Sequence, residues 1–241
     1  MQAMPTDHPP GAVCMITGDT TRYALSMQCL NCLQVPPGSV LAWHMGVLIA
    51  RSINDAFQVV LDTPRLQWAW LMGDDHTYEP DTVLRLLARA KEVVVPLCLN
   101  RMPPMDPTII EHPARRMKFL NDLPAAGLYR LAPTETCGDA GLLIRRPALE
   151  ALGPPWYDRI QSGAHRAEDQ EFIAKIHAHG FDVWVDLETT LGHIGTVNFL
   201  PVRKNGHWEV RMMGGGRRHI ADVLPQRLAA PVPLAEAGRG G

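Results

Sequence analysis

Two acidic pairs have the residue types and spacing that could support catalysis. Asp74 and Asp75 directly follow the apolar run 68–72, and carboxylates placed there can bind a hard divalent cation together with substrate phosphates. Glu168 and Asp169 begin a helical pattern, where a carboxylate can act as general base for an acceptor hydroxyl. Each pair also has a structural explanation. The first can be a solvated turn that caps the next helix, and the second can stabilise a helix N-terminus through its dipole.

A single histidine follows these pairs late in the chain. His193 lies between Gly192 and Gly195, after the apolar segment 181–185. Glycines on both sides allow the backbone to approach a ligand closely. A lone histidine is more often a structural or surface residue than a ligand. His193 is therefore informative only in combination with the two acidic pairs.

The segments around these residues alternate between strand and helix patterns. Short apolar runs predict strands at residues 12–17, 40–43, 68–72, 93–99, 136–144 and 181–185. Helical spacing of apolar residues predicts helices at about 20–33, 47–61, 80–90 and 168–179. This order predicts an α/β domain with a largely parallel sheet. Ligands of such sheets bind beyond the carboxyl ends of the strands, where Asp74 and Asp75 fall.

The composition narrows the class of protein. The chain has 241 residues, of which 46% are hydrophobic and 20% are charged, and its formal net charge is −2. These values suit one large globular domain, and the small net charge argues against generic attraction to nucleic acid or anionic lipid. No apolar run approaches the roughly 20 residues of a membrane-spanning helix. No Lys or Arg precedes Arg22, so we expect no signal peptide.

The cysteines indicate a reducing compartment. Five cysteines cannot all pair, which favours a reduced, cytoplasmic protein. Cys29 and Cys32 form a lone C-x-x-C in an apolar stretch. Buried cysteines of a helix explain this pair better than a redox or zinc site, because no second pair lies nearby.

The ordered set of motifs resembles the GT-A fold glycosyltransferases, especially the family 2-like enzymes of bacteria and phages. The resemblance covers about residues 10–200. It is strongest at Ala167-Glu168-Asp169-Gln170-Glu171-Phe172, followed by 180–186 and Gly192-His193. Weaker matches are Trp70-Leu71-Met72-Gly73-Asp74-Asp75-His76, the glycine-containing segment 137–146, and Ala50-Arg51. Gly73 stands where the family's D-x-D motif has its first Asp.

The resemblance implies a fold and a division of the chain. We expect a GT-A-like, Rossmann-like α/β fold, with a mixed, mostly parallel sheet flanked by helices, in a single domain with a C-terminal extension. The expected parts are an N-terminal tail (1–10), the glycosyltransferase domain (11–200), a basic extension on or near the site (201–224) and a flexible tail (225–241).

The resemblance also implies an activity and its residues. The expected reaction is metal-dependent transfer of a sugar from a nucleoside-diphosphate sugar, with UDP the favoured nucleotide, to an acceptor hydroxyl. Asp169 is the expected base of an inverting reaction, with Glu168 beside it. Mn²⁺ or Mg²⁺ would be held by Asp75 and His193. Contacts to the nucleotide sugar are expected from Thr17, Gly18, Arg22, Arg51, Asp74, Gly138 and Gly141.

The acceptor leaves several possibilities open. Trp156 and Tyr157 could stack on an acceptor sugar or base, although simple packing also explains them. Basic residues in the segment 201–220 could bind the donor diphosphate, a phosphorylated acceptor or nucleic acid. A carbohydrate acceptor is favoured over a hydroxymethylated DNA base, the substrate of a phage-type DNA glycosyltransferase. A non-catalytic sugar-nucleotide binding module and a nucleotidyltransferase are further alternatives.

Overall fold

The computed structural model describes residues 1–3, 6–18, 24–46, 48–101, 105–112, 114, 116–158, 168–195 and 198–213. Arg22 therefore lies outside the described residues, as do the part of the basic extension after residue 213 and the expected tail 225–241.

One large mixed sheet runs through the molecule. Its main path is β15 (His207–Met213), β14 (Asn198–Lys204), β13 (Val183–Ile194), β7 (Val93–Cys98), β12 (Leu143–Arg145), β5 (Trp68–Gly73), β2 (Ala12–Thr17) and β4 (Val40–Met45). The pairs β4–β2, β2–β5 and β7–β13 are parallel, whereas β12 is antiparallel to both of its neighbours. β10 (Leu128–Arg130) and β6 (His76–Thr77) also pair with β13.

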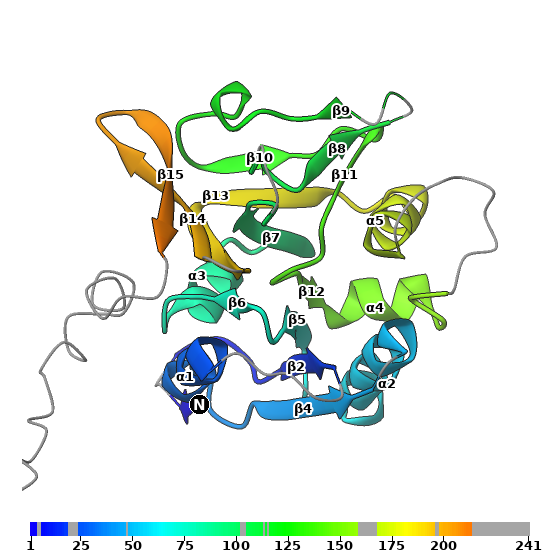
Figure 1. Ribbon diagram of the computed structural model, residues 1–241. Helices are drawn as coiled ribbons and strands as arrows, with labels where there is room; N and C mark the ends of the chain where they lie inside the picture. Colours follow the sequence, from blue (N-terminus) through cyan, green and yellow to red (C-terminus); the bar gives the residue numbers. More distant parts are fainter. Residues whose placement is uncertain are drawn as a thin grey trace, which may run out of the picture.

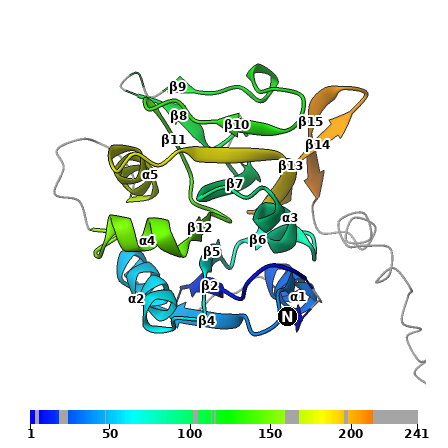
Figure 2. The same cartoon turned by 180° about the vertical axis from the view of Figure 1, so that it is seen from behind.

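Helices cover both faces of this sheet (Figures 1 and 2). α1 (Ala24–Cys32) and α3 (Thr82–Ala88) pack on one face, and α2 (Ile49–Asp62), α4 (Arg146–Leu152) and α5 (Glu168–Ala178) pack on the other. Alternate residues of β2 divide between the two cores: Cys14 packs with the α2 side and Met15 with the α1 side. Because both faces are buried in the middle of the sheet, β2, β5 and β7 are apolar along most of their length. The predicted α/β class is confirmed.

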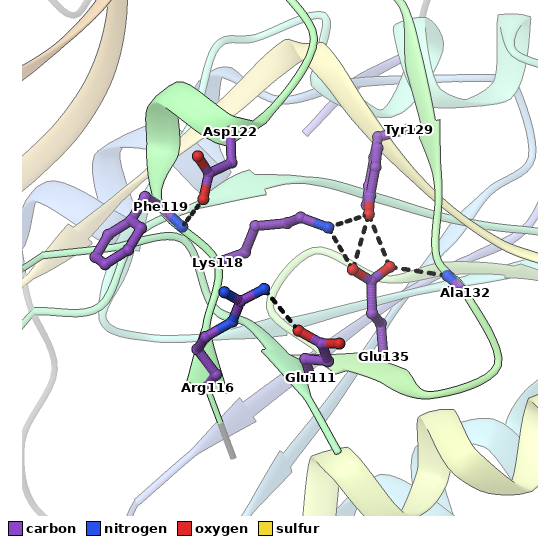
Figure 3. Close-up of polar contacts among 8 residues, drawn as sticks. All are labelled: Glu111, Arg116, Lys118, Phe119, Asp122, Tyr129, Ala132 and Glu135. Atoms are coloured by element: carbon purple, nitrogen blue, oxygen red, sulfur yellow. Dashed lines mark hydrogen bonds and ion pairs between the residues drawn. The ribbon is translucent and has the colours of Figure 1, made fainter. Parts of the chain in front are cut away.

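A smaller three-stranded antiparallel sheet lies beside the large one. It consists of β11 (Glu135–Cys137), β8 (Ile109–Glu111) and β9 (Arg116–Met117), and the 3-10 turn η1 (Leu120–Asp122) follows it. A buried polar network around Glu135 connects this sheet to β10 (Figure 3). A two-residue parallel pair, β1 (Gln2–Ala3) with β3 (Gln34–Val35), completes the strands.

Two predicted strands differ from the structure. The segment 136–144 is not one strand, because it forms β11 in the small sheet and then β12 in the large one. Gly141 makes this crossing possible: its φ is +71°, and a Cβ there would lie 2.6 Å from Pro96 Cγ. Gly141 is therefore required for packing, and its expected role in binding the sugar stays a prediction. The strand predicted at 181–185 is instead the 12-residue β13, which continues to Ile194.

The end of the described chain belongs to the large sheet. The expected boundary at residue 200 falls inside β14, which forms a hairpin with β15. Trp208 of this hairpin is buried against the core, whereas Arg203 and Lys204 are exposed. All five cysteines are free thiols, and both Cys29 and Cys32 lie in α1. Among the described helices, none is long and apolar enough to cross a membrane.

Candidate active site

A cavity of about 410 Å³ lies at the carboxyl edge of β2 and β5. Thr17 and Gly18 line it from the end of β2, and Asp74 and Asp75 line it from the end of β5. Its other lining residues are Ile16, Gly46, Ile49, Ile53, Leu71, Met72, Gly73, His76, Asp139 and Ala140. A Cβ at Gly18 would meet no atom of the described residues within 4 Å. Four of the expected site residues therefore meet in one cavity.

Asp75 is surrounded by three basic side chains. Its Oδ1 lies 2.8 Å from His76 Nδ1, at ion-pair distance but without the alignment of a regular hydrogen bond. Its Oδ2 accepts a hydrogen bond of 3.0 Å from Arg101 Nη1 and lies 3.4 Å from His193 Nε2. Burial raises the pKa of Asp75, but the His193 and His76 rings lower it more, to well below its usual range. Asp75 is therefore an anion that two imidazoles and a guanidinium neutralise.

The strand register explains why the two histidines meet. β6 and β7 both pair with β13: His76 is paired with His193, and Cys98 is paired with Leu191, two residues earlier in the strand. The two imidazole rings stack with their centroids 4.5 Å apart. Gly73 gives this group room, because a Cβ there would lie 3.0 Å from Asp75 Oδ1. The glycine in place of the motif's first Asp thus permits close packing of Asp75 and His76.

Cys98, at the end of β7, completes a cluster with the two histidines. Its sulfur and one ring nitrogen of each histidine all lie within 4.8 Å of one another. Burial raises the pKa of the Cys98 thiol, but interaction with the His193 and His76 rings lowers it more, to about 7. Burial lowers the pKa of both histidines, but Asp75 and Cys98 raise it more, to about 9 for His76 and about 10 for His193. Opposite charges thus stabilise each other in the cluster.

Asp139 and Asp169 form a second acidic group, at the place where the chain passes from the small sheet to the large one. Tyr157 OH donates a hydrogen bond of 2.6 Å to Asp139 Oδ2. Asp169 comes close to the same turn, since a Cβ at Gly138 would lie 3.6 Å from Asp169 Oδ2. Burial and the neighbouring Asp139 raise the pKa of Asp169 to about 7, and burial also raises the pKa of Asp139. A carboxyl group with a pKa near neutrality is suited to general base catalysis.

A second cavity, of about 590 Å³, shares Ile49 with the first. It brings together Arg51, Tyr157 and Glu168, three residues of the expected site. Its other lining residues are Leu48, Ile49, Ala50, Asn54, Asp55, Pro155 and Asp158. Arg51 is largely exposed and lies 3.7 Å from Asp55. Arg51 therefore belongs to this second cavity and not to the cavity of Asp75.

The expected stacking of Trp156 and Tyr157 on an acceptor is wrong. The two side chains are only 2% and 3% exposed, and both pack in an aromatic cluster with Phe57 and Phe172. Trp156 Nε1 donates to the carbonyl oxygen of Leu149. Protein covers the ring faces, so the packing interpretation holds. Tyr157 still lines the second cavity, and its hydroxyl group donates to Asp139.

Four residues of the site were not predicted as site residues. His76 follows Asp75 directly, and Asp139 lies among glycines at the end of a short apolar segment, so both had a local signal. Cys98 had only its position at the end of a predicted strand. Arg101 lies in a proline-rich segment without periodicity. The fold places Cys98 beside the two histidines and Arg101 beside Asp75.

Comparison with known proteins supports the fold. The sequence matches no protein-family model and no curated protein. Among solved structures, it is similar to one described as the crystal structure of A197 from STIV, with a TM-score of 0.56 and 11% sequence identity. The match covers 86% of this chain and 95% of that chain. At this identity the similarity concerns the fold alone, which is a single mixed α/β domain with helices on both sides of its sheet.

Proposed function

We propose that the chain is a glycosyltransferase that moves a sugar from a nucleoside-diphosphate sugar to an acceptor hydroxyl. One observation carries the proposal. The cavity at the carboxyl edge of β2 and β5 is lined by Asp74 and Asp75 and also by Asp139, whose charge acts on Asp169. Candidate groups for donor binding therefore line a single cavity, and Asp139 of the same cavity interacts with Asp169, the candidate base. Its volume of about 410 Å³ falls in the range of small-molecule sites.

The donor would bind with its nucleoside at β2. Ile16, Ile49 and Ile53 provide an apolar wall for a base, for which uracil is the favoured candidate. Thr17 and Gly18 line the cavity beside this wall. Asp74 would accept hydrogen bonds from the ribose hydroxyls. A divalent cation held by Asp75 and His193, Mn²⁺ or Mg²⁺ by analogy with the family, would neutralise the departing diphosphate.

Asp169 would act as the base. As the acceptor oxygen attacks the anomeric carbon, the bond from that carbon to the diphosphate oxygen breaks, and the hydroxyl proton moves to Asp169. Attack on the face opposite the diphosphate inverts the configuration. The hydrogen bond from Tyr157 holds Asp139 in the position from which it raises the pKa of Asp169. Glu168 lines the second cavity, which is the proposed route for the acceptor.

A donor screen tests this proposal. The full chain is mixed with nucleoside-diphosphate sugars, with and without Mn²⁺, and both thermal stabilisation and release of nucleoside diphosphate are measured. We expect stabilisation by one donor with slow release. Stabilisation without release in the presence of any acceptor would indicate a binding module. No response to any donor would overturn the proposal.

The base assignment has its own test. Asp169→Asn is expected to lower turnover by about 10²- to 10⁴-fold while donor stabilisation is unchanged. The matched control is Glu171→Gln, in the same helical turn, which should retain turnover. Acceptor screens should include carbohydrates and DNA with a hydroxymethylated base. Free thiols at all five cysteines suit the cytoplasmic location that we propose for this reaction.

A further inference from the structure

The cluster of His76, Cys98 and His193 has a composition that the proposed reaction does not require. Mg²⁺ and Mn²⁺ prefer oxygen ligands, whereas this cluster offers one sulfur and two imidazoles. Among the described residues, no other group of three His, Cys, Asp or Glu side chains has its ligand atoms this close together. The C-x-x-C of α1 is not part of it.

Each histidine has its second nitrogen beside an acceptor. His193 Nδ1 lies 3.0 Å from the carbonyl oxygen of Leu99, so the proton stays on Nδ1 and a metal ion at Nε2 would replace the proton there. His76 Nδ1 lies 2.8 Å from Asp75 Oδ1. Histidine ligands of metals commonly have such a carbonyl or carboxylate partner, which fixes the tautomer and the ring orientation.

The remaining nitrogen of His76 is a buried polar atom without a regular hydrogen bond, although the ring interacts with the Cys98 thiol. Its Nε2 makes no hydrogen bond to any described residue, and the side chain is only 8% exposed. A buried polar group in this state is costly unless something binds it. Cys98, which is 3% exposed, supplies a free thiol in the same cluster.

We propose that Cys98, His76 and His193 form a Zn²⁺ site, with the thiolate and the two Nε2 atoms as ligands. One thiolate with two imidazoles is a ligand set typical of zinc, and three protein ligands leave a fourth position open. His76 and Asp75 line the cavity of about 410 Å³, so the fourth ligand would come from there. Asp75 itself or a phosphate oxygen of a bound ligand has the required chemistry.

This site deepens the proposed function, since zinc would replace Mg²⁺ or Mn²⁺ beside the donor diphosphate. The role at the diphosphate depends on the glycosyltransferase proposal, but metal binding does not. The zinc site and the glycosyltransferase proposal can therefore be tested independently. Zinc binding is measured with the metal alone, and donor binding is measured with the nucleotide sugar.

Cobalt provides a spectroscopic test on the full chain. After treatment with a chelator and a reductant, the protein is titrated with Co²⁺ while near-ultraviolet absorption is recorded. We expect one equivalent to bind with a thiolate-to-cobalt charge-transfer band, and Zn²⁺ to remove that band. Cys98→Ser should abolish the band and weaken Zn²⁺ binding at least about 100-fold. The matched control is Cys14→Ser, at a buried thiol in β2, which should retain both.

X-ray absorption of the zinc-loaded wild type tests the ligands without any variant, in case Cys98→Ser fails to fold. We expect one sulfur at about 2.3 Å and nitrogen or oxygen atoms at about 2.0 Å. A shell without sulfur would overturn the proposal. So would a wild type that binds neither metal, or a charge-transfer band that persists in a folded Cys98→Ser protein.

Discussion

Two buried polar groups in this molecule are built differently. Around Glu135, the chain satisfies every charged group itself (Figure 3): Lys118 Nζ lies 2.5 Å from one carboxylate oxygen, and Tyr129 OH lies 2.8 Å from both oxygens. The amide of Ala132 donates a further hydrogen bond of 2.8 Å. Around Asp75, in contrast, His76 Nε2 is buried without a hydrogen bond to any described residue. A complete network stabilises the fold, whereas an incomplete one is a candidate ligand site.

The two groups also differ in what they connect. Lys118 follows β9, Glu135 begins β11 and Tyr129 lies in β10, so the first network attaches the small sheet to the large one. Burial raises the pKa of Glu135, but Lys118 and the other donors lower it more, to below its usual value. The Asp75 cluster joins the ends of β5, β7 and β13, where a cavity opens. The network with all its hydrogen bonds thus lies between the two sheets, and the cluster with an unbonded nitrogen lies beside the cavity.

The largest effect on stability is expected from breaking the complete network. Glu135→Ala leaves the Lys118 ammonium and the Tyr129 hydroxyl partly buried without their acceptor, and it should lower the free energy of unfolding by about 3–5 kcal/mol. Urea denaturation measures this change. The control is Glu111→Ala, which removes an exposed ion pair with Arg116 (Figure 3) and should cost at most about 1 kcal/mol. Equal losses in the two variants would contradict the comparison.

A smaller effect on the free energy of unfolding is expected when Zn²⁺ binds to the cluster of His76, Cys98 and His193. Zn²⁺ at 100 times its dissociation constant should raise the free energy of unfolding by about 2.7 kcal/mol, because it binds only the folded chain. Chelation should reverse this gain. In His76→Gln the same zinc concentration should have little effect, while Glu135→Ala should show the full increment. A gain that persists in His76→Gln would mean that zinc binds elsewhere.

The sequence was sufficient for the elements that depend on local pattern. The apolar runs at 12–17 and 93–99 match β2 and β7 because strands buried on both faces are uniformly apolar. Thr17 and Asp74 could be placed in one cavity because parallel strands bring their carboxyl ends to one edge. Local pattern failed at 136–144, where one apolar segment with two glycines supplies strands to two different sheets.

The cluster of three ligands could not be predicted for a different reason. His76 and His193 meet because the two-residue β6 pairs with the C-terminal end of β13. This end of β13 follows a shift in its register with β7, between Asp186 and Thr190. A strand of two residues has no periodicity to detect. For Trp156 the sequence predicted contact with a ligand that the structure does not allow. An exposed tryptophan could stack on a sugar, but Trp156 packs against Phe57 of α2, which also contacts Phe172 of α5, and it is buried. Long-range packing decided both outcomes.

Asp169 extends the comparison to a carboxylate with the opposite pKa shift. The pKa of Glu135 is lowered, so its ionised form stabilises the fold; the pKa of Asp169 is raised to about 7, so its ionised form destabilises it. Between about pH 4 and 7 the folded state binds more protons at Asp169 than the unfolded state does. This contribution to stability is therefore complete below pH 4 and lost as the pH rises through 7.

Asp169→Asn removes this titration and should make the protein more stable than the wild type at pH 8. The expected difference is on the order of 1–2 kcal/mol, since one pKa unit corresponds to about 1.4 kcal/mol and solvent reaches part of the side chain. Urea denaturation at pH 4.5, 6 and 8 should show the difference increasing with pH. The control is Asp182→Asn, at an exposed ion pair with Arg130, where the difference should stay within about 0.5 kcal/mol. A difference for Asp169→Asn that is constant or falls with pH would mean that burial and Asp139 do not raise the pKa of this carboxyl group. It would remove the physical reason for assigning Asp169 as the base.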